Sequence, residues 1–427
     1  MQKIYNDKYQ ETIYKKILTN GLRVHVIHKP DYNSSSAFFA VPFGSLDYKQ
    51  YINKLENEVP SGAAHFLEHK LFEDKDKDVM GMFSNIGANV NAFTSYNETV
   101  YYFTTSNQDV VTPLTMLIDF VQNLNIDEKS IEKEKGIIMQ ELLMYKQIPD
   151  HRLLMETLKA LYHQFPLKYD IVGSEESVKR MSLNDLNNAY ELNYFPKNML
   201  LTIVTPTSPE LIFDVIEKNQ NKKTFKDNFL PKRAHFNEPI NVVNDFISIK
   251  MDVNKTKVCL AFKLPVLKET SIDRIKTEWG LRLLLEGYFT GLNNKYQDWL
   301  DEKKITDYFG YDVDISDDYA LLLFYNEIED PFSFKEMVVD QLLKLKKELI
   351  SDELLIQLKR RYFGKSIRLF NNVSDIGVAY LRSVFDEIDI FESMNIINNI
   401  DRKTLISVVK RLDLSNASIV EIRKTEG

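Results

Sequence analysis

One stretch of this chain, GAAHFLEHKLF at residues 62–72, organises the interpretation of the rest. His65 and His69 are four residues apart, so on a helix their imidazoles lie on one face, one turn apart. Two nitrogens placed in this way can reach one zinc ion at ~2.0–2.1 Å each. Glu68 flanks the same face and can act on a metal-bound water without being a ligand. The apolar residues of the stretch would pack the helix in place, and no proline interrupts it.

A third ligand is needed, because a catalytic zinc usually has three protein ligands and an open position. The helical pattern at residues 128–145 has an apolar stripe, and Glu134 and Glu141, seven residues apart, lie along one edge of it. Glu141 is expected to be enclosed by apolar neighbours, namely Met139, Leu142, Leu143 and Met144. An unpaired charge is costly in such a place, and a cation would remove the cost. The pattern therefore predicts a zinc site made by His65, His69 and Glu141.

The same string has a simpler interpretation, which the pattern alone leaves open. Two surface histidines beside a salt-bridging glutamate would give the same residues at the same spacing.

Other motifs are weaker: residues 363–366, FGKS, resemble the end of a phosphate-binding loop, but Lys359 stands where that loop needs its first glycine. No Gly-x-Ser-x-Gly elbow of a serine hydrolase occurs in the sequence.

The chain also carries a weak internal repeat. Charged helices are predicted to begin at Ile126 and Ile350, each after an apolar helix. Later in each half a helix leads into an asparagine and a β-branched run, at Asn198 and Asn416. The members of the two pairs are separated by nearly the same length of sequence, which favours duplication over coincidence. The second half has no histidine at residues 283–289 and no glutamate near residue 365, so we expect one metal site per chain.

The repeat also predicts the domain organisation. A chain of 427 residues is too long for one ordinary core. Residues 219–238 are rich in Asn, Lys and Pro, and we interpret them as a linker. It would join a zinc-bearing domain at 1–218 to a second homologous domain at 239–427 without the metal site. Strands mixed with runs of longer helices predict an α+β fold made twice, each copy a mainly antiparallel sheet packed with helices.

The composition limits the binding partners and the cellular compartment that we expect for this chain. The formal net charge is -8, and no basic block forms a phosphate-binding stripe, which argues against nucleic acid. No apolar run approaches the ~20 residues that span a bilayer, and residues 1–21 have no apolar core of a signal peptide. The single cysteine, Cys259, stands among apolar residues and is expected in the core. We expect a cytoplasmic protein.

The quoted residues resemble a known family, the pitrilysin/insulinase family of zinc metallopeptidases. His65 to His69 match its inverted zinc motif, with a glutamate pair spaced as Glu134 and Glu141. The resemblance covers nearly the whole chain; it includes the strand-like TNGLRV at residues 19–24, and residues 194–204 resemble the end of the family's first domain. Within the family, chain length and motif context look most like the bacterial YmfH-type branch, whose members are often encoded beside a second family subunit.

The resemblance implies roles for single residues. His65, His69 and Glu141 would be zinc ligands, Glu68 would deprotonate the zinc-bound water, and Glu134 would orient a ligand histidine. Asn91, Ala92 and Phe93 would bind an extended peptide by strand addition. Without the resemblance, residues 91–95 would be interpreted as an ordinary strand and turn.

One departure from the family pattern affects the expected assembly. Active members usually carry an arginine and a tyrosine seven residues apart that hold the substrate carbonyl. Tyr308 fits the tyrosine, but Asp301 occupies the arginine position and cannot donate to a developing oxyanion. The resemblance therefore implies a heterodimer, in which a related subunit supplies the arginine–tyrosine pair, with a homodimer as the other arrangement.

The predicted function is that of a zinc metalloendopeptidase that hydrolyses unstructured peptides. Two alternatives stay open. The chain could be a non-catalytic structural or assembly subunit of a family complex, although such a subunit would not need a base beside two ligands. It could also be a metal-binding protein without catalysis, if the open coordination position were blocked.

Overall fold

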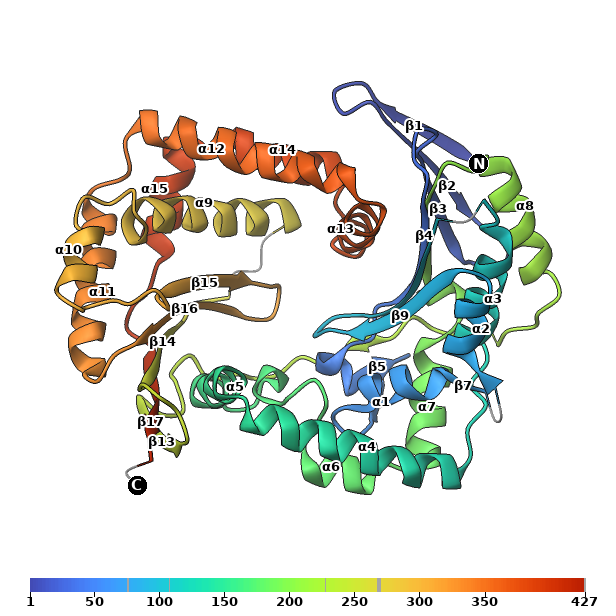
Figure 1. The fold of residues 1–427 in the computed structure, drawn as a ribbon, viewed down its shortest axis with the longest axis horizontal. Helices are drawn as coiled ribbons and strands as arrows, with labels where there is room; N and C mark the ends of the chain where they lie inside the picture. Colours follow the sequence, from blue (N-terminus) through green and yellow to red (C-terminus); the bar gives the residue numbers. More distant parts are fainter. Residues whose placement is uncertain (75–76, 107, 227, 267–269, 426–427) are drawn as a thin grey trace. The chain divides into compact units, whose positions relative to one another are not determined.

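The computed structural model describes residues 1–74, 77–106, 108–226, 228–266 and 270–425. They form two compact units (Figure 1). Unit 1 comprises Met1–Leu143, Tyr169–His235 and Arg368–Phe385. Unit 2 comprises Met144–Lys168, Phe236–Ile367 and Asp386–Gly427. Within the described ranges, no helix is long and apolar enough to cross a membrane.

Unit 1 is built on a seven-stranded sheet with the strand order β1-β2-β3-β11-β4-β10-β9. Its central strands β4 and β11 are buried along their whole length, which explains their continuous runs of apolar and small residues. The strands are β1 (Gln2–Asn6), β2 (Glu11–Ile17), β3 (Arg23–His28), β4 (Ser35–Val41), β9 (Ala88–Thr94), β10 (Thr99–Thr105) and β11 (Leu200–Thr205). β3 and β11 are parallel, and the other neighbours are antiparallel.

Helices cover both faces of this sheet. α2, α3 and α8 lie on one face, and α13 lies on the other (Figure 1). The helices of unit 1 are α1 (Ala63–Leu71), α2 (Val79–Asn85), α3 (Val111–Val121), α4 (Glu128–Gln147), α6 (Glu175–Arg180), α7 (Leu183–Asn193), α8 (Pro209–Gln220) and α13 (Val373–Phe385). A small three-stranded sheet consists of β12 (Lys232–Arg233), β5 (Lys49–Ile52) and β6 (Leu55–Glu58). A two-stranded sheet pairs β7 (Glu73–Asp74) with β8 (Lys77–Asp78).

Unit 2 is built on a five-stranded sheet with the strand order β13-β17-β14-β16-β15. Alternate side chains of β14 face opposite layers: Val258, Leu260 and Phe262 join the helical core. Cys259 is buried, as predicted. The elements are α5 (Pro149–Leu161), β13 (Phe246–Met251), β14 (Lys257–Lys263), α9 (Ser271–Phe289), α10 (Tyr296–Asp301), β15 (Gly310–Ile315), β16 (Ala320–Glu327), α11 (Pro331–Lys347), α12 (Asp352–Ile367), α14 (Ile390–Asn399), α15 (Arg402–Arg411) and β17 (Ala417–Lys424).

The two sheets share one topology, and the predicted α+β fold made twice is confirmed. The order β3-β11-β4-β10-β9 in unit 1 matches β13-β17-β14-β16-β15 in unit 2, with the same strand directions. The hairpins β9–β10 and β15–β16 both close through four residues, so Ile315 stands where Thr94 stands in the first half. Ile315 follows Thr94 by 315 − 94 = 221 residues. This separation lies between that of Asn198 and Asn416, 416 − 198 = 218, and that of Ile126 and Ile350, 350 − 126 = 224.

Each half contributes one helix to the unit formed mainly by the other half. α5, from the first half of the sequence, packs on β14 and β17, while α13, from the second half, packs on β4 and β11. The units are therefore discontinuous in sequence. The boundaries at 1–218 and 239–427, with their linker, stay a prediction about the repeat; within the linker, β12 pairs with β5.

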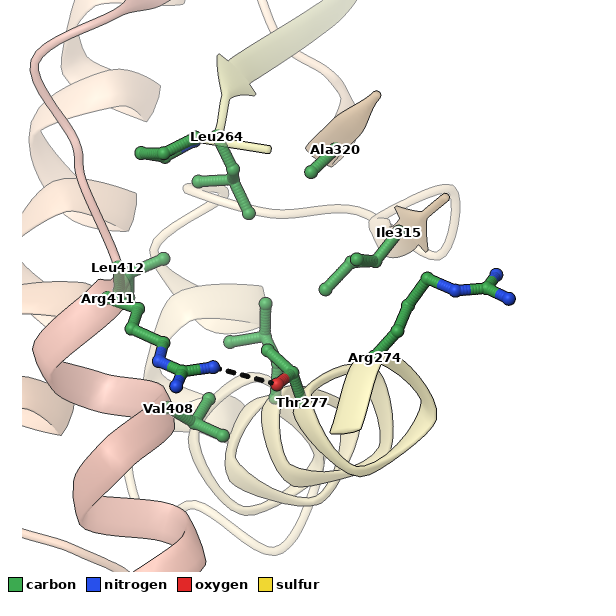
Figure 2. Close-up of a pocket in the computed structure, with 10 residues that line it drawn as sticks. Leu264, Arg274, Thr277, Ile315, Ala320, Val408, Arg411 and Leu412 are labelled. Atoms are coloured by element: carbon green, nitrogen blue, oxygen red, sulfur yellow. Dashed lines mark hydrogen bonds between the residues drawn. The ribbon is translucent and has the colours of Figure 1, made fainter. Parts of the chain in front are cut away.

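Unit 2 has a cavity at the closed end of the β15–β16 hairpin (Figure 2). Apolar side chains from α9 and α15 line it, and Arg411 donates to Thr277 at 3.5 Å beside them.

Candidate metal centre

The helix α1 that carries the motif starts at a position that only glycine suits. Gly62 caps the helix with φ of +87°, and a Cβ there would meet the carbonyl oxygen of Val172 at 2.3 Å. From this start, Phe66, Leu67 and Leu71 are buried, and α1 packs against α7 and β9. The helix is therefore fixed at its first residue and along one face, which sets the direction of its histidines.

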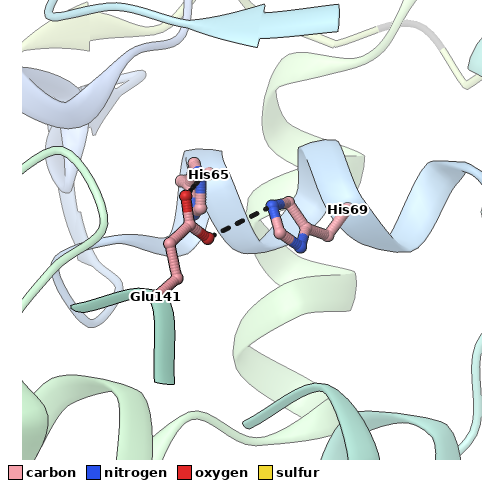
Figure 3. Close-up of side chains that lie close together, drawn as sticks. All are labelled: His65, His69 and Glu141. Carbon is pink, nitrogen blue, oxygen red and sulfur yellow. Dashed lines mark ion pairs between the residues drawn. The ribbon is translucent and has the colours of Figure 1, made fainter. Parts of the chain in front are cut away.

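The structure brings His65, His69 and Glu141 together. Their ligand atoms all lie within 4.8 Å of one another, and theirs is the one such group found in the described part of the chain. His65 Nε2 is 3.8 Å from Glu141 Oε1, and His69 Nε2 is 3.7 Å from Glu141 Oε2. Figure 3 shows the carboxylate, which comes from α4, turned toward both rings on α1.

These distances fit a metal site better than a set of hydrogen bonds. They exceed the 2.7–3.2 Å of N–H···O bonds. Two ligand atoms at ~2.0–2.1 Å from one tetrahedral zinc lie about 3.3–3.4 Å apart, so a small side-chain shift would close the site. His65 Nδ1 is buried, and no hydrogen-bond partner is found for it among the described residues. Two imidazoles and one carboxylate are the donor set of several catalytic zinc sites, which keep an open position.

Electrostatics keep His65 in the form that binds a metal. Burial lowers the pKa of His65 to about 3, and the neighbouring His69 acts in the same direction. The imidazole is therefore neutral at physiological pH, with a lone pair available. The ring centroids of His65 and His69 are 4.5 Å apart, which suits two ligands of one ion.

Glu134 holds the second histidine, and Lys70 in turn pairs with Glu134. Glu134 Oε1 lies 3.0 Å from His69 Nδ1, so that nitrogen donates to the carboxylate and leaves Nε2 for a metal. Lys70, which is fully buried, places Nζ 3.5 Å from Glu134 Oε2. Burial by itself would raise the pKa of Glu134, but its contacts with His69 and Lys70 lower it below the usual range. The sequence interpretation did not identify Lys70, although it directly follows His69.

Glu68 is suited to accept a proton. It does not join the ligand group, and its Oε2 accepts a hydrogen bond of 2.6 Å from Thr94 Oγ1. Burial raises the pKa of Glu68, and the hydrogen bond from Thr94 opposes the rise. A base whose pKa lies nearer to neutrality transfers protons more efficiently in both directions. Thr94 is a second residue that the sequence interpretation did not assign.

The expectation that apolar side chains enclose Glu141 was wrong in part. Leu142 is buried, but Leu143 and Met144 are 44% and 51% exposed. These residues project from the outer side of α4, since a helix turns by 100° per residue. Glu141 is half-buried and owes its surroundings to α1 rather than to its neighbours in sequence.

The predicted substrate residues lie on an edge strand. Asn91, Ala92 and Phe93 belong to β9, which ends the sheet, so its outer edge has no strand partner in the described ranges. Thr94, the last residue of this strand, touches Glu68. An extended peptide added to this edge would run toward the candidate metal centre.

Tyr308 lies in unit 2, in the loop between α10 and β15. Its hydroxyl donates to Asp150 at 2.7 Å, and Lys257 Nζ is 3.8 Å from its ring centroid. Asp301, at the end of α10, accepts from Gln297 at 2.9 Å. Lys304, near the position of the missing arginine, pairs with Glu302 at 2.7 Å.

The second half has a different polar cluster on the helix that corresponds to α1. On α9, buried Glu286 accepts hydrogen bonds from Tyr362 at 2.8 Å, Tyr311 at 3.0 Å and Arg361 at 2.5 Å. These donors satisfy the carboxylate without a metal ion. A glutamate bound by tyrosines and an arginine thus stands on the helix that would have to hold the histidines.

Comparisons with known proteins agree with this arrangement. The family described as Insulinase (Peptidase family M16) matches residues 23–175, and the Peptidase M16 inactive domain matches residues 180–362. The zinc protease YmfH of Bacillus subtilis (strain 168) is 33% identical over 407 residues, covering 95% of this chain and 94% of YmfH. The chain belongs to the insulinase family of zinc proteases, peptidase family M16.

Solved structures show the same architecture. An M16-like peptidase from Alicyclobacillus acidocaldarius superposes with a TM-score of 0.91 at 27% identity, over 97% of this chain and 99% of that one. Pitrilysin gives a TM-score of 0.75 at 18% identity, over 99% of this chain and 46% of pitrilysin. The mitochondrial-processing peptidase subunit beta of Neurospora crassa is 27% identical over 209 residues, 48% of this chain and 42% of that subunit.

Proposed function

We propose that this chain is a zinc metalloendopeptidase that hydrolyses unstructured peptides, with one zinc per chain held by His65, His69 and Glu141. The observation that carries the proposal is the convergence of these three ligands beside Glu68, a half-buried carboxylate outside the ligand group. The cytoplasmic location is part of the proposal, since Cys259, the single cysteine, can form no intramolecular disulfide.

The side chains divide the chemistry among them. A zinc ion in the site would act as a Lewis acid toward a water molecule and the scissile carbonyl. Glu68 takes a proton from the attacking water and passes it to the leaving amine. Thr94 orients the Glu68 carboxylate, and Glu134 holds His69 in the tautomer that leaves Nε2 free. Asn91, Ala92 and Phe93 bind the peptide backbone along the edge of β9.

Two variants test this assignment. Glu68→Gln should lower kcat by about 10²–10⁴-fold and leave the zinc content unchanged, since it removes the base but no ligand. Glu141→Gln should instead lose zinc during dialysis against a chelator. Mass-spectrometric detection of fragments from a mixture of unstructured peptides, together with elemental zinc analysis, reads out both variants. A fully active Glu68→Gln protein would exclude the proposed base.

We infer that the active form is an assembly with a related subunit. Asp301 stands at the position where the family pattern has an arginine, so this chain lacks the arginine donor of the pair that holds the substrate carbonyl. Tyr308 keeps the tyrosine of that pair, and Tyr308→Phe should lower kcat if its hydroxyl serves the substrate. Mixing with the related subunit should raise peptidase activity sharply. Unchanged activity on mixing would favour a homodimer, which light scattering of the purified chain would show.

A non-catalytic assembly subunit is the second candidate function. It is favoured by the match of residues 180–362 to the Peptidase M16 inactive domain and by Asp301. Glu68 opposes it, because an assembly role needs no base beside two ligand histidines. Bound zinc without cleavage, alone and with the related subunit, would select this second function.

A further inference from the structure

An arginine from α13 stands over the strand that we propose binds the substrate. Arg382 Nε donates a hydrogen bond of 3.1 Å to Oε1 of Glu98, which lies in the turn between β9 and β10. The guanidinium carbon of Arg382 is 5.9 Å from the ring centroid of Phe93. The Arg382 side chain is 52% exposed, whereas the Glu98 side chain is 7% exposed. The buried carboxylate thus fixes one side of a cation whose other side faces solvent.

The position of Phe93 relates this cation to the candidate base. Successive side chains of a strand point to opposite faces, so Phe93 and Thr94 face opposite ways. Thr94 touches Glu68, and the Phe93 ring lies 6.3 Å from that of Tyr102, against the apolar cluster that includes Leu381 of α13. One residue along β9, about 3.3 Å, therefore separates the strand position that touches the base from the position beneath Arg382.

The guanidinium has donors to spare. Arginine carries five N–H groups, and in the described part of the chain the contact with Glu98 uses Nε. A strand added to the edge of β9 places its side chains on the two faces in register with those of β9, with Cβ atoms ~4.5–5.5 Å from their cross-strand neighbours. A substrate side chain beside Phe93 would thus lie under the outer N–H groups of Arg382.

We propose that Arg382 forms a substrate subsite for an acidic side chain, aspartate or glutamate, within about two residues of the scissile bond. A carboxylate there would accept from the terminal N–H groups of the guanidinium, a charge-assisted contact. Phe93 forms the apolar floor under the methylene groups of that side chain. The inference rests on the proposed function, because it takes the edge of β9 as the peptide-binding edge.

The test compares peptides that differ by one charge. Matched peptides carry glutamate or glutamine at each position within three residues of the cleaved bond. Wild-type protein should favour glutamate at one of these positions by about 10-fold or more in kcat/KM. Arg382→Gln should bring the ratio close to one, and Arg382→Lys should leave an intermediate ratio. A ratio measured within one protein is insensitive to the fraction of that protein that is folded.

A matched control exists in unit 2. Arg423 is also 52% exposed, and its Nε pairs with Oε1 of the buried Glu421 at 2.6 Å. Arg423→Gln should leave the glutamate-to-glutamine ratio of the wild type unchanged. Equal kcat/KM for all matched pairs in the wild type, or an undiminished ratio in Arg382→Gln, would overturn the subsite.

Binding separates this inference from the proposed function. The zinc-loaded Glu68→Gln protein is titrated with the same fluorescent peptides, and Kd is measured by anisotropy. If the glutamate peptide binds more tightly and this preference depends on Arg382, the subsite is supported even when no peptide is cleaved. Absence of cleavage would then reject the proposed peptidase activity but not the subsite. Equal Kd values for the pair would overturn the subsite even in an active peptidase.

Discussion

The hydroxyl of Thr94 donates a 2.6 Å hydrogen bond to Glu68 and so connects the edge strand β9 to the candidate base. The matching hairpin of the second half has Ile315 at this position, which has no hydroxyl to donate. Strand edge and base are thus linked in the first half through one side chain. A peptide bound along β9 would be positioned against Glu68 by the same residue that holds the carboxylate in place.

Replacing Thr94 with valine should lower kcat by roughly 10–100-fold, the effect expected when a charged group loses one hydrogen bond. Valine keeps the shape and the β-branch, so the strand should persist. Thr94→Ser, which keeps the hydroxyl, is the matched control and should retain most of the activity. Steady-state kinetics and zinc content together would decide: a fall in zinc content would mean that Thr94 acts on the metal site instead.

Glu134→Gln should weaken zinc binding by about 10–100-fold, because the second partner of a metal-binding histidine fixes its tautomer and its orientation. The measurement is competition for zinc with a chromophoric chelator. Glu132 lies on the same helix, and its side chain is 69% exposed and paired with Lys135. Glu132→Gln should leave the zinc affinity unchanged. Equal losses in both variants would point to α4 as a whole rather than to the contact with His69.

The residues that share one face of each helix in the candidate site could be predicted from the sequence, because helical spacing depends only on positions along the chain. His65 and His69 lie on one face of α1 at i and i+4, and Glu134 and Glu141 lie two turns apart on α4. That both helices converge could not be derived from spacing. The prediction that Glu141 joins the histidines rested on its expected apolar surroundings and on the resemblance to a family, and the structure places the ligand atoms within 4.8 Å of one another.

The supporting contacts were not predictable, since they join residues far apart in the chain. Thr94 is 26 residues from Glu68, and Arg382 is 284 residues from Glu98. The exchange of α5 and α13 between the units is of the same kind. Hydrophobic periodicity identifies an amphipathic helix, but it does not identify which sheet the helix covers.

The docking of α13 on β4 gives a stability prediction at Gly377. A Cβ there would meet the Phe38 ring at 2.0 Å, and Phe38 is fully buried in the central strand β4. Gly377→Ala should therefore destabilise unit 1 by about 1–3 kcal/mol, despite the better helix propensity of alanine. Denaturant unfolding followed by circular dichroism measures the change.

Gly364 in α12 is the matched control. A Cβ at Gly364 would meet nothing within 4 Å. Gly364→Ala should leave the protein unchanged or stabilise it by up to about 1 kcal/mol, since alanine reduces the entropy of the unfolded chain. If both alanine variants were equally stable, α13 would not be held closely against the sheet.

The contact of α13 with β3 predicts an acid-sensitive fold. His25 on β3 is buried, with Nδ1 3.1 Å from the hydroxyl of Tyr380, and burial lowers its pKa to about 3, assisted by Lys15 and Arg23. The unfolded chain, with a pKa near 6.5, binds the proton first. The stabilisation from neutral His25 is thus fully present above pH 6.5 and is lost as the pH falls toward 3.

Between pH 7.5 and 5 the wild type should lose roughly 2 kcal/mol more unfolding free energy than His25→Gln, in which position 25 cannot titrate. Urea unfolding at the two pH values, with chelator present in every sample, measures the difference. The metal-centre histidines titrate in both proteins alike, so their contribution cancels in the comparison. Parallel losses in the two proteins would mean that His25 is already accessible to protons in the folded state, and that α13 does not seal this part of β3 from solvent.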